Sequence, residues 1–299
     1  MTATTVTPKI KRRSMKSPYS YWFYVVPAAI FAIFFLLPTF ASLYFSLTRW
    51  TLFDATFIGL GNFRQFFTEP ALLQGFVNTF IYTVVTTGLK VVIGMLLGVL
   101  LASQIFARGY LRSVVFFPTI VSTIGVGFTF SVLMNPEKGL INQALAVIGI
   151  QGPHWLTDPH WALISVALVD VWKGVGIATV IYIAGIVSIP TEYFEAAKID
   201  GAGSFKIFTQ IILPLARPAA VTVIILSAIS GLRSFDLIWS MTSGGPGSAS
   251  DVIGSVIYKE YAAGFYGLSS AGNVVLSLVV AAISLPLWAF LNRTSKKDY

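Results

Sequence analysis

The chain has 299 residues, of which 56% are hydrophobic and only 11% are charged, and its mean hydropathy is +0.79. This composition is typical of a membrane protein with several spans and excludes a soluble domain with a polar surface. The net charge of +8 does not require nucleic acid as a partner, because the basic residues lie at the edges of the apolar segments. The absence of cysteine excludes disulfides, thiol catalysis and cysteine metal sites.

A polar, basic tail at residues 1–20 precedes the apolar segments. The first apolar segment, residues 21–47, is too long for the core of a signal peptide and predicts an uncleaved span. Further spans are predicted at residues 76–105, 112–134, 161–187, 218–240 and 268–292. The predicted fold is therefore an all-α membrane protein with six transmembrane helices. Its expected domains are the tail 1–20, a transmembrane domain at 21–292 with its core at about 76–292, and a second tail at 293–299.

The distribution of lysine and arginine predicts which side each loop faces. With six spans, the basic residues on the side of the N-terminus are Lys9, Lys11, Arg12, Arg13, Lys16, Arg108, Arg112, Lys198, Lys206, Arg217, Arg293, Lys296 and Lys297. The opposite side carries Arg49, Arg64, Lys138 and Lys259. Both termini and the loop near Glu195 are therefore expected to be cytoplasmic. His154 and His160 share an outer loop, where ordinary hydrogen bonding is favoured over a metal site.

The longest polar interruption in the second half of the chain, residues 190–218, predicts two short helices joined by a turn. Glu192 lies near the positive end of the first helix dipole, where an acidic residue is favourable. Asp200 and Gly201 end this helix, because glycine adopts a positive φ at little cost. Apolar residues then return at helical spacing, from Phe205 to Leu215. The segment is expected to form an elbow on one side of the membrane.

The spacing of Glu195-Ala196-Ala197, Gly201, Ile211 and Leu213-Pro214 resembles the EAA loop of ABC-importer permeases. The resemblance implies the type I importer permease fold, with a cytoplasmic loop that docks into a separate ATPase. The implied coupling residues are Glu195, Ala196, Ala197, Asp200, Gly201, Ile211, Leu213 and Pro214. Two outer segments are similar to segments of carbohydrate-class permeases. The first contains Phe57-Ile58-Gly59-Leu60-Gly61-Asn62-Phe63 and Phe76-Val77-Asn78-Thr79, and the second is Thr242-Ser243-Gly244-Gly245-Pro246-Gly247.

The same resemblance implies an assembly in a prokaryotic inner membrane. Its partners would be a second, homologous permease, two ATPase subunits and an extracytoplasmic solute-binding protein. The chain contains no G-x-x-x-x-G-K-[ST] motif, so it lacks a phosphate-cradling loop of its own. We therefore expect no enzymatic activity and no cofactor in this chain, with ATP and Mg²⁺ held by the partner ATPase.

Charged residues inside the predicted spans suggest a functional site, because an unpaired charge costs several kcal/mol in hydrocarbon. Asp170 and Lys173, and likewise Arg233 and Asp236, have the i,i+3 spacing of a pair on one helix face. Lys90 has no obvious partner in the sequence, and snorkelling or a contact on the partner subunit is the favoured explanation. Structural pairing inside a bundle is the alternative explanation for the two i,i+3 pairs.

Two stripes of small and polar residues occur on the spans that flank the loop. One comprises Asp170, Lys173, Gly174 and Ile177, and the other comprises Ser227, Ser230, Gly231 and Ser234. Such stripes suit close helix packing or a hydrated cavity, and the adjacent charges favour the cavity. The expected substrate-path residues are Asp170, Lys173, Gly174, Ser227, Ser230, Gly231 and Ser234, with Trp172 beside them as an aromatic surface for a sugar.

The sequence thus predicts a permease subunit that carries a sugar or oligosaccharide by alternating access. A glycerol phosphate ester is a second candidate solute, with Lys173 and Arg233 meeting its phosphate. An ion-coupled secondary carrier is a third possibility, but it predicts internal repeats that the sequence does not clearly contain. A membrane enzyme is the remotest, since no nucleophile, base and orienting group can be assembled.

Overall fold

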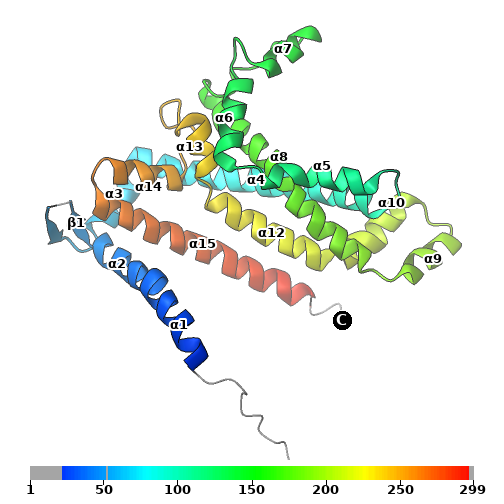
Figure 1. The fold of residues 1–299 in the computed structure, drawn as a ribbon, viewed down its shortest axis with the longest axis horizontal. Helices are drawn as coiled ribbons and strands as arrows, with labels where there is room; N and C mark the ends of the chain where they lie inside the picture. Colours follow the sequence, from blue (N-terminus) through cyan, green and yellow to red (C-terminus); the bar gives the residue numbers. More distant parts are fainter. Residues whose placement is uncertain (1–21, 52, 296–299) are drawn as a thin grey trace, which may run out of the picture.

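The computed structural model describes the backbone of residues 22–51 and 53–295, and side chains as far as residue 289 apart from residue 52. The basic residues of the tail 1–20, the side chain of Arg293, and Lys296 and Lys297 lie outside the described residues. The described chain is almost entirely helical, with one antiparallel hairpin of β1 (Thr48–Trp50) and β2 (Ala55–Phe57) (Figure 1). In this hairpin Thr48 pairs with Phe57 and Trp50 with Ala55.

By length and composition, four single helices in the described part of the chain are able to cross a membrane. They are the N-terminal helix Trp22–Ser46, α4 (Pro70–Ala102), α8 (Pro159–Val187) and the first part of α15 (Tyr266–Ser295). Two bent pairs bring the number of spans to six if each pair is counted as one. These are α5 (Arg108–Ile120) with α6 (Thr123–Leu133), and the segment Ser204–Leu215 with α12 (Arg217–Leu232).

The third predicted span, residues 112–134, is not one straight helix. It divides at Val121, and α5 and α6 meet at 96°. Pro118 cannot donate a backbone hydrogen bond in the last turn of α5, and the side chain of Ser122 accepts a hydrogen bond from the N–H of Gly125 to begin α6. The apolar composition that suggested a single span is therefore shared by two helices of different direction.

The fifth predicted span, residues 218–240, also ends earlier than expected. The helix α12 stops at Leu232, and Phe235, at φ −147°, precedes the separate helix α13 (Asp236–Thr242). Asp236 lies in the first turn of α13, where a carboxylate is favourable beside the unpaired N–H groups. Arg233 and Asp236 therefore belong to different elements, and the prediction that they pair on one helix face is wrong.

Two short π-helical segments interrupt the helices, and each ends two residues before a proline. The first, Ala32–Leu36, joins α1 (Trp22–Phe31) to α2 (Leu37–Ser46) and precedes Pro38. The second, Phe208–Ile212, joins α10 (Ser204–Ile207) to α11 (Leu213–Leu215) and precedes Pro214. Proline has no N–H and its ring crowds the preceding turn, so the i→i−4 ladder is disturbed there, and the N–H of the residue before the proline reaches one residue further back. Leu37 donates to Ala32 and Leu213 to Phe208 in this way.

The helices α4 and α8 form the centre of the bundle, and glycines allow their backbones to approach closely. A Cβ atom on Gly94 would lie 2.7 Å from the Cβ of Ala178, and one on Gly98 would lie 2.6 Å from the Cβ of Tyr182. The helix α12 packs against both α4 and α8. Small residues at such contacts supply van der Waals packing, which holds helices together where lipid replaces water.

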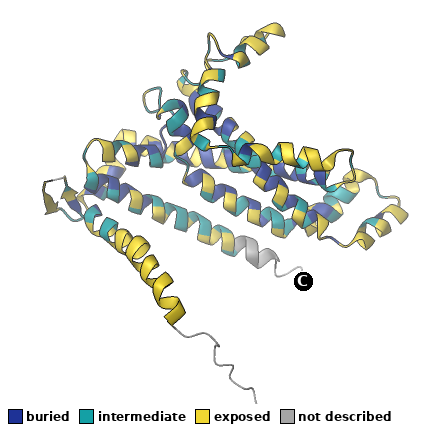
Figure 2. Ribbon diagram, in the orientation of Figure 1, coloured by how far each residue is buried: buried dark blue, intermediate teal, exposed yellow. Residues whose placement is uncertain are grey.

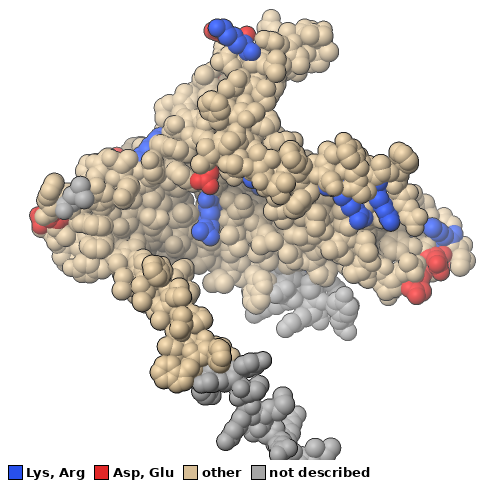
Figure 3. Space-filling view, viewed as in Figure 1, with Lys and Arg blue, Asp and Glu red and all other residues tan. Residues whose placement is uncertain are grey.

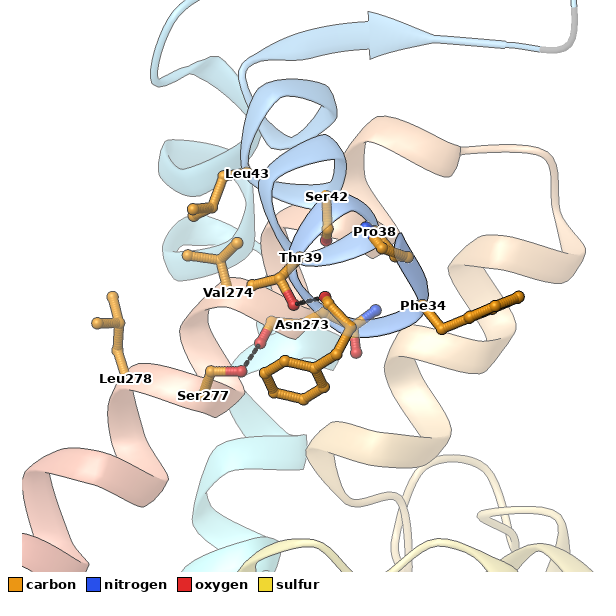
Figure 4. A pocket seen from close by; sticks show the side chains of 10 residues that line it. Phe34, Pro38, Thr39, Ser42, Leu43, Asn273, Val274, Ser277 and Leu278 are labelled. Atoms are coloured by element: carbon orange, nitrogen blue, oxygen red, sulfur yellow. Dashed lines mark hydrogen bonds between the residues drawn. The ribbon is translucent and has the colours of Figure 1, made fainter. Parts of the chain in front are cut away.

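The N-terminal helix projects from this bundle, as Figure 2 shows by its exposed surface. No residue in the most apolar window of this helix is buried. Its α2 end contacts α15, and a groove of about 440 Å³ opens between them (Figure 4). Phe34, Pro38 and Leu43 line one side of the groove, and Asn273, Val274 and Leu278 line the other. This helix therefore needs lipid or another subunit to cover it.

The two outer segments that resemble carbohydrate-class permeases lie against each other. The side-chain amide of Asn78, on α4, donates to the carbonyl oxygens of Ser248, Ala249 and Asp251 at 3.3, 3.0 and 2.8 Å. The hydroxyl of Thr79 accepts a hydrogen bond from the N–H of Ile253, which begins α14 (Ile253–Ala262). These bonds fix the glycine-rich loop between α13 and α14 to the end of α4.

Of the remaining helices, two lie at the ends of the bundle, and α7 (Leu140–Val147) projects away from it beyond α6 (Figure 1). The two are α3 (Gly61–Thr68), beside the hairpin, and α9 (Thr191–Ile199), which together with α10 forms the opposite end. The bundle is therefore bounded by the hairpin, α3 and α14 at one end and by α9 and α10 at the other.

Candidate functional site

A buried ion pair lies at the centre of the bundle. The ammonium nitrogen of Lys90, on α4, is 2.7 Å from the carboxylate of Asp170, on α8, and Lys90 is only 4% exposed. The expectation that Lys90 lacks a partner within the chain is therefore wrong. Asp170 was expected to pair with Lys173, three residues along its own helix, but the structure pairs it across the bundle. At this depth each ion offsets part of the other's lost hydration, so the removal of one alone would leave an uncompensated charge.

Lys173 makes a different contact from the one predicted. Its ammonium lies 3.5 Å from the carbonyl oxygen of Thr119, and the Thr119 hydroxyl donates to the carbonyl oxygen of Lys173 at 3.0 Å. These two contacts join the last turn of α5 to the middle of α8. Lys173 thus supports the bend between α5 and α6, and among the described residues it makes no ion pair with Asp170.

A cavity of about 220 Å³ lies beside the ion pair, between α4, α8 and α12. Its lining residues are Lys90, Gly174, Ile177, Ala178, Ile181, Val223, Leu226, Ser227 and Ser230. Three of the predicted path residues, Gly174, Ser227 and Ser230, are therefore brought together. A Cβ atom on Gly174 would lie 2.7 Å from the Cε of Lys90, so the lysine side chain occupies the space that this glycine leaves open.

The remaining members of the second stripe have other surroundings. Gly231 is buried against α4, where a Cβ atom would lie 2.9 Å from the Cα of Thr83. Gly231 is therefore a packing position. Ser234 follows the end of α12, beside the buried side chain of Tyr82. Trp172, expected as a sugar-facing aromatic, packs on Phe130 with ring centroids 5.2 Å apart.

The sequence analysis missed the polar face of α4. Its buried polar residues include Asn78, Thr79, Thr83, Thr86 and Lys90, and Tyr82 is fully buried on the same helix. The Tyr82 hydroxyl is buried near Asp170 and Ser234 but makes no hydrogen bond to either. The detectable signal was the recurrence of polar groups at three- and four-residue intervals from Asn78 to Lys90, within an otherwise apolar segment. Lys90 lies on this face, and its ammonium group contacts Asp170 on α8.

The cavity makes a testable prediction about water access. Cysteine placed at Ser230, which is exposed, is expected to react with a small water-soluble thiol reagent, and cysteine at the nearly buried Ser227 is expected to react more slowly. Val223 and Leu226 are outside the stripe of Ser227, Ser230, Gly231 and Ser234, but they line the same cavity and cannot serve as protected controls. Ala228, 6% exposed, is the appropriate control. Equal labelling at Ser230 and Ala228 would contradict a hydrated cavity.

The predicted elbow is formed by α9, a turn and α10, at one end of the bundle (Figure 1). Gly201 has φ +69°, as the sequence analysis expected, and its N–H donates to the carbonyl of Lys198. The N–H of Ala202 donates to the carbonyl of Ala197 at 2.8 Å, which satisfies another of the last carbonyls of α9. Asp200 is the C-terminal cap of α9.

The helix α9 has two distinct faces. Thr191, Phe194 and Lys198 face the bundle and line a pocket there. Glu195 and Ala196 are exposed, Ala197 is buried, and Ile199 is 87% exposed just before the turn. Beyond the turn Phe205 is 79% exposed, and Leu213 and Pro214 are also exposed, whereas Ile211 is half-buried. Apolar side chains exposed at a helical elbow are typical of an interaction site.

The two histidines of the outer loop lie near the start of α8. Asp158 accepts a hydrogen bond from the N–H of His160 at 2.9 Å, which caps the helix and holds the pKa of this carboxyl group below its ordinary value. The ring of His160 lies 3.1 Å from the same carboxylate. Among the described residues, no group of three or more His, Asp and Glu side chains is placed to hold a metal ion.

The fold and the elbow define a class of membrane transport component, and comparison with known proteins identifies the family. Residues 90–295 match the family described as "Binding-protein-dependent transport system inner membrane component". The chain belongs to this family of ABC transporter permeases. The match contains the ion pair, the cavity and the elbow. The family description also identifies the chain as an inner-membrane component of a transport system. It therefore favours the permease over the ion-coupled carrier and the membrane enzyme considered from the sequence.

Individual relatives extend the similarity over nearly the whole chain. A probable ABC transporter permease protein, YurN of Bacillus subtilis, is 32% identical over 93% of this chain and 97% of its own. The trehalose/maltose transport system permease protein MalF of Thermococcus litoralis is 31% identical over 94% of this chain and 95% of its own. The lactose transport system permease protein LacF of Rhizobium radiobacter is 30% identical over 91% and 95%.

A solved structure of a bacterial ABC transporter involved in the import of the acidic polysaccharide alginate contains a chain with the same fold. The TM-score is 0.77, at 22% identity, over 91% of this chain and 94% of that chain. A second structure of an alginate transporter, in complex with an alginate pentasaccharide-bound periplasmic protein, gives a TM-score of 0.75 at 21% identity, over 92% and 93%. The predicted ABC-importer permease fold is thereby confirmed.

Proposed function

We propose that this chain is one of two permease subunits of an ATP-driven importer for a neutral sugar or oligosaccharide. The observation that carries the proposal is the cavity between α4, α8 and α12, which lies within the part of the chain that matches the family. Its polar groups are the serine hydroxyls and the ammonium of Lys90, and Ile177, Val223 and Leu226 supply apolar surface. Sugars require both, because they present hydroxyl groups and apolar ring faces.

The ion pair favours a neutral solute over a glycerol phosphate ester. Lys90 is the cation that lines this cavity, and its charge is matched by Asp170 at 2.7 Å. Lys173, which the phosphate alternative assigns to the solute, lies against the carbonyl oxygen of Thr119. Relatives named for trehalose and maltose, for lactose, and for multiple sugars support a carbohydrate. Uptake of labelled candidate solutes by cells that express the complete system decides between the two classes.

The assembly proposed for this chain has a second permease, two ATPase subunits holding ATP and Mg²⁺, and an extracytoplasmic binding protein. The exposed elbow around Glu195 supplies an ATPase contact, and the alginate structure with its periplasmic protein supports the binding-protein partner. The exposed N-terminal helix and its groove beside α15 offer a surface for the second permease (Figure 4). ATP-driven movement of the elbow would then open and close the path on alternate sides.

The ATPase contact predicts the effect of reversing one charge. Glu195→Lys is expected to weaken co-purification of the ATPase subunit in mild detergent at least severalfold, because an exposed anion at the contact becomes a cation. Glu192→Lys, an exposed change one turn earlier on α9, is a matched control that is expected to have a smaller effect. Unchanged recovery of the ATPase with Glu195→Lys would place the docking surface elsewhere.

The proposed orientation places both termini and the elbow in the cytoplasm. Reporter fusions at Lys297 and between residues 191 and 206 are expected to report the cytoplasm, whereas fusions near Glu137 and Gly245 are expected to report the outside. The motive is the excess of basic residues on the N-terminal side. An external signal at Lys297 would show that either this orientation or the count of six spans is wrong.

A further inference from the structure

A pocket of about 710 Å³ lies where the bundle meets α9 and α10. Three basic side chains, those of Arg108, Arg112 and Lys198, line it. Figure 3 shows basic side chains at this end of the molecule, with acidic side chains beside them nearer its tip. No carboxylate is among the described residues that line this pocket, so its electrostatic potential favours an anion.

The three basic residues come from two separate elements. Arg108 and Arg112 lie one turn apart at the start of α5, and Lys198 lies on the inner face of α9. Arg112 is held in place by two hydrogen bonds, of 3.1 and 2.6 Å, from its guanidinium to the carbonyl oxygen of Leu101. The remaining N–H groups of this guanidinium stay available to an oxygen ligand in the pocket.

The other lining residues are mostly apolar and continue the surface of the spans. Val99 and Ala102 belong to the last turn of α4, and Ile186 and Val187 to the last turn of α8. The pocket is therefore level with the ends of two membrane-crossing helices, where lipid headgroups begin. Tyr110, which is 72% exposed two residues from Arg108, is one of the aromatic residue types enriched at this depth.

We propose that this pocket binds an anionic phospholipid, with its headgroup phosphate between Arg108, Arg112 and Lys198 and its acyl chain on the apolar wall. Three cations around an apolar surface at the membrane edge complement both parts of such a lipid. A hydrated acidic peptide or a free phosphate ion would contact the basic side chains but would leave the apolar wall uncovered. Because Lys198 is on α9, the lipid would join the elbow to α5. With the proposed orientation, it belongs to the cytoplasmic leaflet.

The binding test uses the purified full-length chain in mild detergent, titrated with phosphatidylglycerol or with zwitterionic phosphatidylcholine and measured by native mass spectrometry. Phosphatidylglycerol is expected to bind more tightly. The double variant Arg108→Gln and Lys198→Gln is expected to lose about fivefold in affinity for each charge removed. The double variant Lys138→Gln and Lys206→Gln removes the same net charge at exposed positions outside the pocket and is expected to bind as the wild type does.

A second measurement tests the contact with α9. Hydrogen exchange of residues 191–199 is expected to slow in nanodiscs containing phosphatidylglycerol relative to phosphatidylcholine alone, and Lys198→Gln is expected to abolish the difference. Arg108→Lys combined with Lys198→Arg keeps both charges and is expected to keep the protection, which separates loss of binding from misfolding. Because no partner subunit is needed, these results do not depend on the proposed transport function.

Three outcomes would overturn the lipid proposal. Equal binding of the two lipids, or an equal loss in the control double variant, would show that the pocket has no preference for an anionic headgroup. Protection of residues 191–199 by inorganic phosphate alone, to the same extent as by phosphatidylglycerol, would identify a free anion as the ligand. Protection that arises only when the ATPase subunit is added would assign the pocket to an acidic protein segment.

Discussion

Replacing Gly201 by valine is expected to uncouple ATP hydrolysis from transport while leaving the protein in the membrane. Gly201 adopts φ +69°, a conformation that costs a β-branched residue about 1–3 kcal/mol. No atom lies within 4 Å of the position that a Cβ would take, so the penalty comes from the backbone alone. A cost of this size lowers the population of the native turn between α9 and α10 by about 5- to 150-fold. Substrate-stimulated ATP hydrolysis in proteoliposomes should fall accordingly.

The chain supplies a matched control two residues away. Gly203 has φ −72° in an extended conformation, and its Cβ position is equally open, so Gly203→Val changes side-chain size without backbone strain. Gly201→Asn is a second control, because asparagine tolerates a positive φ better than other residues do. Both control variants are expected to retain substrate-stimulated ATP hydrolysis. If Gly201→Val also retained it, the turn geometry would play no part in coupling, and equal losses in both valine variants would point to crowding instead.

Replacing Lys90 by methionine is expected to lower both stability and uptake. The substitution leaves the carboxylate of Asp170 without its partner at 2.7 Å, and breaking a buried pair costs about 3–5 kcal/mol. Because the Asp170 side chain is 19% exposed, we expect the low end of this range. Titration with a denaturing detergent measures the stability of the purified chain, and accumulation of labelled solute measures transport.

The double variant separates the structural role of the pair from its role in the path. Combining Lys90→Met with Asp170→Leu removes both charges, and such replacement is often neutral or stabilising. We expect stability to recover while uptake stays below about a tenth of the wild-type value, the size of effect that one lost charged hydrogen bond produces. Wild-type uptake by the double variant would show that the pair only holds α4 against α8. Val169→Leu, a buried apolar change on α8, controls for repacking alone.

Features that depend on neighbouring residues were predictable from the sequence. The apolar segments at 21–47, 76–105, 161–187 and 268–292 correspond to helices, because span length and composition are properties of a continuous segment. The turn at Gly201 was predicted for the same reason, since its positive φ follows from the residue type at the end of one helix. The break in the third span at Val121 and the early end of the fifth at Leu232 were missed, because hydropathy records apolar content and carries no information on helix direction.

The pairing of distant groups was decided only by the tertiary structure. Lys90 and Asp170 are 80 residues apart, and their contact depends on the close packing of α4 on α8 through Gly94 and Gly98. Asn78 likewise binds carbonyl oxygens that lie more than 160 residues further along the chain. Periodicity shows that a helix has a polar face, but the partner of that face is set by which helices meet and at what rotation. The sequence by itself therefore determined four of the spans and the elbow, whereas helix packing decided the ion pair, the cavity and the basic pocket.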